Sequence, residues 1–302
     1  MKLFKTIASV AAIVLLAATA FSADQKKIVL VAGKPSHGPG AHEFRAGCLL
    51  LQKCLNEVPG YNAVVYSNGW PKDVNAFDGA DAIVLYMDGA EGHPAIQDDH
   101  LQQLDAAMKR GVGLGCIHFA VEVPKDHGGQ EFLKWIGGYF ETYWSLNPTW
   151  VADFKEIPEH PCTRGVKPFE IKDEWYYHMR FQPDHVTPLL SAIPPETAMK
   201  GTDTAHSGDP EELQKHKGEP QVLAWAYDRP DGGRGFGFTG AHYHTNWGND
   251  NFRKLVLNSI VWIAKGDVPA DGIQSTVTLE ELEKNLDPKG QRKKKPVAAV
   301  QP

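Results

Sequence analysis

The sequence lacks the short motifs that identify several common catalytic mechanisms. It has no G-x-S-x-G nucleophile elbow, no phosphate-binding P-loop, no H-E-x-x-H zinc motif and no C-x-x-C pair. The glycine-rich segment GGRGFGF leads from a turn into a strand, whereas a dinucleotide fingerprint leads from a strand into a helix.

The chain also has little cysteine and no excess of positive charge. Its 31 Lys and Arg residues face 37 Asp and Glu residues, a formal net charge of −6, which argues against a broad nucleic-acid surface. The only basic run is KGQRKKKP, within a C-terminal extension that we place at 269–302 and expect to be solvated and disordered at its end. The four cysteines, Cys48, Cys54, Cys116 and Cys162, are interpreted mainly as small buried residues, and any pairing is left open.

Only one long apolar run occurs, and it lies at the N-terminus. MKLFK is followed by TIASVAAIVLLAATAF and by small residues suited to cleavage, the pattern of a secretory signal peptide over residues 1–22. About 16 apolar residues are short for a membrane span, so an uncleaved anchor is the alternative rather than the prediction. We expect an exported protein, periplasmic or extracellular.

Apolar strand-like runs alternate with helical patterns through the first half and again near the end. Strands are predicted at 27–33, 62–67, 81–89 and 112–120, and helices at 41–58, 98–111 and 249–266. Continuous apolar strands separated by helices predict an α/β fold with an open, doubly wound, mostly parallel sheet of the flavodoxin-like kind. Ligands of such a sheet bind outside the carboxyl ends of its strands.

The middle of the chain, about 121–220, is irregular and rich in aromatic residues, proline and histidine. We interpret it as aromatic-rich insertions that form binding loops or lids. Residues 149–157 alternate like an antiparallel or edge strand, and PDGG between 221–229 and 233–242 predicts a hairpin.

Titratable residues gather in four segments that each adjoin a predicted strand end or turn. The candidates are His37, His42 and Glu43 in SHGPGAHEF, His118 and Glu122 in GCIHFAVE, Asp173, Glu174 and Tyr177 in KDEWYYH, and His242 and His244 in GAHYHTNWGND. Because His42 and Glu43 are adjacent at a helix start, we expect that they do not both point inward.

His242 and His244 have the i, i+2 spacing that places two rings on one face of a strand, an arrangement suited to a divalent metal such as zinc. With His37, His42 or His118 they would complete a three-nitrogen site. The alternatives are histidines that bind a polar ligand or act as acid–base groups, and histidines that are only structural.

Two further features have competing interpretations. Cys116 precedes the sharp turn expected at the end of its strand and is a conceivable nucleophile, but its apolar neighbours favour a core residue, and His118 is the better candidate for the exposed turn. Aromatic residues such as Trp144 suit a sugar site, and packing alone explains many of them.

Four ordered segments together resemble the ThuA-like (trehalose-utilisation) family, and the chain looks like an exported member. They are KIVLVAGKPSHGPGAHEF, GVGLGCIHFAVE, HPCTRGVKPFEIKDEWYYHMRF and GRGFGFTGAHYHTNWGNDNFRKLVLNSIVWIAKGDVP. The resemblance implies a ThuA-like domain over 26–268 with a class I glutamine amidotransferase-like fold. Because the elbow is occupied by His118 or its neighbour, no glutamine-hydrolysing triad is carried over. The resemblance also implies a role in carbohydrate metabolism, through 3-keto-sugar intermediates that a partner sugar oxidoreductase makes.

We therefore expect a small-molecule sugar ligand and no nucleic acid. In the first hypothesis the chain is an enzyme that processes a disaccharide, glycoside or 3-keto-sugar derivative, with His118 or His37 as acid–base, aided by Glu43 or Glu174. The expected substrate contacts are His42, Glu122, Asp173, Tyr177 and Trp144, and a metal would bind at His242 and His244. The alternatives are a non-catalytic carbohydrate-binding protein of the cell envelope and a hydrolase that uses Cys116.

Overall fold

The computed structural model describes residues 25–202 and 204–290. A seven-stranded sheet in the order β10-β11-β12-β4-β3-β1-β2 forms its centre. Five neighbouring strands are parallel and two, β11 and β10, continue the sheet antiparallel. The bounds are β1 Lys26–Ala32, β2 Tyr61–Tyr66, β3 Ala80–Tyr86, β4 Gly113–Ile117, β10 Val186–Ala192, β11 Gln221–Asp228 and β12 Arg234–Phe238. The predicted doubly wound, mostly parallel α/β fold is thus confirmed.

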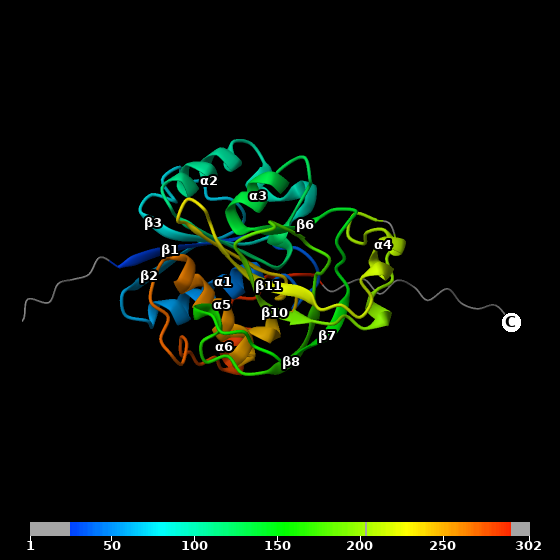
Figure 1. Ribbon diagram of the computed structural model, residues 1–302. Coiled ribbons are helices and arrows are strands. Elements are labelled where there is room, and N and C mark those ends of the chain that lie inside the picture. The colour runs from blue at the N-terminus through cyan, green and yellow to red at the C-terminus, as the bar shows by residue number, and fades with distance from the viewer. Residues whose placement is uncertain (1–24, 203, 291–302) are drawn as a thin grey trace, which may run out of the picture.

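Helices cover both faces of this sheet, as Figure 1 shows. On one face lie α1 (Phe44–Asn56) and α5 (Asp250–Ile263), and on the other lie α2 (His100–Lys109) and α3 (Gly129–Ile136). Each layer buries its own apolar cluster, since successive strand side chains point to opposite faces. In β4, Ile117 belongs to the first cluster and Cys116 to the second.

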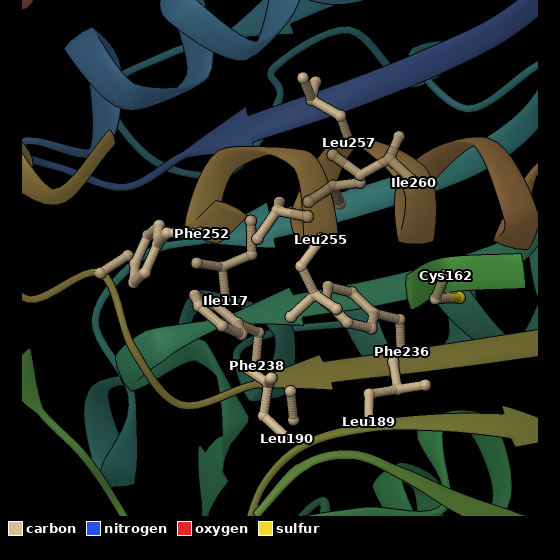
Figure 2. Packing of buried hydrophobic residues seen from close by; sticks show 14 of the residues in the cluster. Ile117, Cys162, Leu189, Leu190, Phe236, Phe238, Phe252, Leu255, Leu257 and Ile260 are labelled. Atoms are coloured by element: carbon tan, nitrogen blue, oxygen red, sulfur yellow. The ribbon is translucent and has the colours of Figure 1, made fainter. Parts of the chain in front are cut away.

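Helix α5 illustrates why these residues form helices. The side chain of Asn249 accepts hydrogen bonds from the backbone N–H groups of residues 251 and 252, which satisfies donors that the first turn leaves free. Leu255 and Ile260 then pack against the sheet together with Phe238, as Figure 2 shows. Asn249 is therefore the N-cap of α5.

The irregular middle forms two small sheets and several short helices. The predicted edge strand is β7, which pairs antiparallel with β8, and the predicted hairpin joins β11 to β12. The remaining bounds are β5 Glu122–Val123, β6 Gly138–Glu141, β7 Thr149–Phe154, β8 Phe169–Glu174, β9 Arg180–Phe181, α4 Pro210–Lys215 and α6 Leu279–Glu283. The 3-10 turns are η1 Ala90–Gly92, η2 Pro94–Ile96, η3 His118–Val121, η4 Pro161–Thr163, η5 Glu196–Ala198 and η6 His244–Gly248.

The structure bears differently on the predictions for the two ends of the chain. The predicted signal peptide lies outside the described residues, as does the basic end of the C-terminal extension. The first part of that extension packs against α1, where Arg45 Nε donates to Asp287 Oδ1 at 3.0 Å. Within the described ranges, none of the helices has the length and apolar character needed to cross a membrane.

Candidate functional site

The carboxyl edge of the parallel strands carries a sharp turn at His118. Strand β4 ends at Ile117 and η3 begins at once, with His118 at a φ of 57°. A non-glycine residue in this left-handed region costs on the order of 1–3 kcal/mol and persists where surrounding contacts fix it. His42 (φ 50°) and Ala241 (φ 84°) share this conformation, so three loops at one sheet edge are held in unfavourable backbone geometry.

Backbone pairing brings the first and last of these loops together. The N–H of His42 donates to the carbonyl of His242 at 3.0 Å, and the N–H of His244 donates to the carbonyl of Gly40 at 2.9 Å. These two bonds place the His42 and His242 rings beside the turn that carries His118.

Four side chains converge there: His42, His118, His242 and Glu174. His42 Nε2 lies 3.0 Å from His242 Nδ1 and 3.1 Å from His118 Nε2, and the latter two nitrogens are 3.3 Å apart. Glu174 Oε2 lies 3.2 Å from His242 Nδ1 and 3.5 Å from His118 Nε2. Ligands about 2.0–2.1 Å from one tetrahedral ion are separated by about 3.3 Å, so these separations fit a shared cation.

The outward-facing ring nitrogens determine which atoms of the cluster carry protons. His118 Nδ1 lies 2.8 Å from the carbonyl oxygen of Thr239, which can only accept, so Nδ1 is the protonated nitrogen. His42 Nδ1 lies 3.1 Å from Asp88 Oδ1, which has the same consequence. The two Nε2 atoms therefore present lone pairs to each other, and burial lowers the pKa of both rings, which keeps them neutral.

Two buried or half-buried aspartates hold the loops in place. Asp88 follows β3, and it also accepts a hydrogen bond from Ser36 Oγ at 2.8 Å. Asp173 is fully buried, and its carboxylate accepts from the backbone N–H groups of Ala241 and His242 at 2.7 and 3.0 Å. The contact of Asp88 with His42 Nδ1 is of the kind that orients metal-binding histidines in known sites, whereas Asp173 holds the backbone of the His242 loop.

The solvent side of the cluster is acidic and partly open. Burial alone would raise the pKa of Glu174, but its hydrogen bond to His242 and the nearby His118 lower it on balance. The side chains of Glu174 and His242 are 20% and 14% exposed, so a ligand can reach them from solvent. His37 stands at this opening, with its ring centroid 3.6 Å from that of His42 and its side chain 39% exposed.

A second polar pair lies beside the cluster. Glu122 is fully buried and its two carboxylate oxygens lie 3.0 and 3.2 Å from His206 Nδ1. Burial raises the pKa of Glu122 to about 7, and the bond to that carboxylate raises the pKa of His206. Tyr176 completes this wall, with its hydroxyl 3.2 Å from His118 Nε2.

Several predicted residues are not brought to the cluster. Glu43 faces the C-terminal extension instead, where it accepts from the N–H of Asp287 at 2.9 Å and pairs with Lys289 at 3.2 Å. His42 and Glu43 thus point to different sides, as expected. His244 is buried and outside the cluster, because η6 begins there and ends the strand-like spacing assumed for His242 and His244.

The aromatic residues serve packing more than a sugar site. Tyr177 is buried, and its hydroxyl donates to the carbonyl of Ala198 at 3.0 Å. Trp144 stacks on His178, which is not one of the four converging residues. Trp135, Tyr139, Trp150, Trp175 and Tyr176 are each at most 4% exposed.

All four cysteines are buried and unpaired. Cys116 has no exposed surface, and burial raises its thiol pKa, which opposes formation of the reactive thiolate.

Sequence reasoning missed Asp88 and His206. Asp88 lies at the carboxyl end of the strand predicted at 81–89, so its place at that edge of the sheet was a usable signal. His206 lies in an irregular segment with no periodicity, and nothing local connects it with Glu122.

Comparisons with known proteins agree with this fold. The family model for trehalose utilisation, ThuA, matches residues 29–263. A ThuA-like protein from Bacteroides uniformis ATCC 8492 is 16% identical with a TM-score of 0.57, over 82% of this chain and 96% of that one. One from Parabacteroides merdae ATCC 43184 is 15% identical with a TM-score of 0.52, over 84% and 94%. No curated protein matches the chain in sequence. Since the family model covers most of its length, the chain belongs to the ThuA family of trehalose utilisation.

Proposed function

We propose that this chain is a metal-dependent enzyme that processes a disaccharide, glycoside or 3-keto-sugar derivative by acid–base chemistry. One observation carries the proposal: three imidazole nitrogens and one carboxylate oxygen converge within hydrogen-bonding distance at the carboxyl edge of the sheet. Membership of the trehalose-utilisation family supplies the carbohydrate class.

The competing explanation is a hydrogen-bonded cluster without metal. A single proton on His242 Nδ1 would face three acceptors, at 3.0 Å (His42), 3.3 Å (His118) and 3.2 Å (Glu174). The Tyr176 hydroxyl can donate to His118 Nε2 at 3.2 Å, but the lone pairs of His42 and His118 would still lie opposed at 3.1 Å in a buried site. A cation engages all four atoms at once, and nitrogen and carboxylate ligands are those that zinc prefers.

A divalent cation bound there would supply a Lewis acid that polarises a carbonyl or hydroxyl oxygen of the sugar. The partly exposed edges of Glu174 and His242 leave access to such an oxygen, because a four-ligand zinc site can expand to a fifth position. His118 then serves as a ligand rather than as the acid–base group that its sequence position suggested.

Proton transfer falls to the pair of Glu122 and His206. The buried carboxylate orients the ring, while the His206 side chain is 43% exposed and can meet a substrate. With Glu122 at a pKa of about 7 and that of His206 raised, the pair can take up or release a proton near neutrality. His37, which also stands at the opening, is a substrate contact in this arrangement.

The non-catalytic alternative has less support. A groove of about 920 Å³ lies between β7 and β10 and has no aromatic residue in its lining. Aromatic faces are what a sugar-binding surface uses for stacking. A hydrolase that uses Cys116 has no support, because its thiol is buried in the apolar cluster on the face of the sheet opposite α5.

The test combines metal content with turnover. Protein purified without chelator is analysed for zinc and other divalent ions, and His118→Ala is compared with His127→Ala, which removes an exposed histidine remote from the cluster. We expect His118→Ala to lose the metal and His127→Ala to keep it. Turnover of 3-keto-disaccharides should follow the metal content. Full turnover by metal-free protein would contradict the mechanism, and tight sugar binding without any product would favour the binding-protein alternative.

A further inference from the structure

A second histidine cluster lies outside the centre described above and shares no residue with it. His178 follows β8, Glu212 lies on α4, and His216 ends that helix. One ligand atom from each of the three residues lies within 4.8 Å of the others. Neither sequence motifs nor the proposed function uses these residues together.

Both rings are oriented as metal ligands are. His178 Nδ1 lies 3.0 Å from the carbonyl oxygen of Trp144, and His216 Nδ1 lies 2.7 Å from Glu219 Oε2. Both partners only accept, so each ring carries its proton on Nδ1 and leaves a lone pair on Nε2. A histidine whose outer nitrogen donates to a carbonyl or carboxylate is the usual arrangement in zinc sites.

The carboxylate of Glu212 completes the set. Its Oε1 lies 3.7 Å from His216 Nε2, one helical turn away, while its Oε2 contacts Lys215 Nζ. One oxygen thus faces the histidines and the other holds a lysine. His178 is buried, and its ring is fixed by stacking on Trp144 at a centroid distance of 4.4 Å.

We propose that His178, Glu212 and His216 form a second divalent-metal site, of the zinc class, that ties α4 to the segment after β8. Two histidines and one glutamate are a known zinc-binding set, with water in the fourth position. His206 and α4 belong to the same irregular segment of the chain. An ion bound at α4 would therefore also restrict the motion of the loop that presents His206 to Glu122. The two clusters share no residue, so this site can bind its ion whether or not the first centre holds one.

The alternative assigns the same residues to surface ion pairs, Lys215 with Glu212 and His216 with Glu219. The two explanations differ in the effect of Lys215→Ala. If Glu212 binds a cation, removing the competing lysine charge should tighten zinc binding at this site by about 2–5-fold. If Glu212 serves only Lys215, the change leaves zinc binding unaltered.

The experiment titrates full-length protein with zinc against a chromophoric chelator. We expect two zinc ions per wild-type chain, one in His216→Ala, one in His118→Ala and two in His127→Ala. Circular dichroism confirms that each variant is folded, and His216→Gln provides a milder replacement if His216→Ala is not. The proposal is overturned if His216→Ala and His216→Gln retain both ions, or if the wild type binds one ion that only His118→Ala removes. If only His118→Ala loses an ion, the second site is disproved while the first centre is supported. The two proposals can therefore fail separately.

Discussion

Asp88 offers a sensitive test of the proposed first centre, because it contacts His42 without being one of the four converging residues. Its Oδ1 accepts from His42 Nδ1 at 3.1 Å and so keeps the lone pair on Nε2 directed at the other ligands. In Asp88→Ala that acceptor is gone, and the ring can place its proton on Nε2. That tautomer cannot bind a metal, so part of the binding free energy is spent on restoring the other one.

The expected size follows from the exposure of Asp88. Loss of an outer-shell partner typically weakens metal binding by about 10–100-fold. The Asp88 side chain is 34% exposed, so water can replace part of the lost hydrogen bond, which places the effect in the lower half of that range. We expect a weakening of about 10–30-fold, or about 1.4–2 kcal/mol.

The assay is zinc competition with a chromophoric chelator, in a His216→Ala background so that only the first centre contributes. Asp184→Ala, which removes an exposed aspartate elsewhere, is the control and should bind like its parent. A dissociation constant for Asp88→Ala within about twofold of the control would refute the orienting role.

Two further changes test other parts of the structure. Glu122→Gln should lower the pKa of His206, because the carboxylate that raises this pKa is removed while the burial that lowers it remains. NMR titration of the His206 ring measures the shift, and an unchanged pKa would disprove the pairing. Lys289→Ala should cost about 3–5 kcal/mol of unfolding free energy, since the fully buried Glu43 loses its ion-pair partner. Lys284→Ala, which removes an exposed i, i+4 pair, should cost less than about 1 kcal/mol in the same urea titration, and equal losses would contradict the account.

The sequence predicted the fold and the functional edge of the sheet better than it predicted which side chains meet at that edge. Continuous apolar strands identified the parallel sheet, and the rule that ligands bind at carboxyl ends identified the loops of His42, His118 and His242. Spacing misled at His244, because the chain turns into η6 and leaves strand geometry. It also misled at Glu43, whose partner Lys289 lies 246 positions further on, by subtraction of the residue numbers.

The sequence also left the role of the aromatic residues in the middle of the chain undecided. Composition alone does not separate a sugar-stacking tryptophan from a core tryptophan. Trp175, which lies in the aromatic-rich middle of the chain, packs edge-on against Phe238 with ring centroids 5.6 Å apart. Burial depends on how β7 and β8 fold back over the main sheet, and that is a long-range property.

The most direct test of the central claim is an anomalous difference map at the zinc edge from a crystal grown with zinc. The account predicts a peak about 2.0–2.2 Å from His42 Nε2, His118 Nε2, His242 Nδ1 and Glu174 Oε2. A zinc-saturated crystal with no peak at that position, and with the four atoms still in mutual contact, would contradict it.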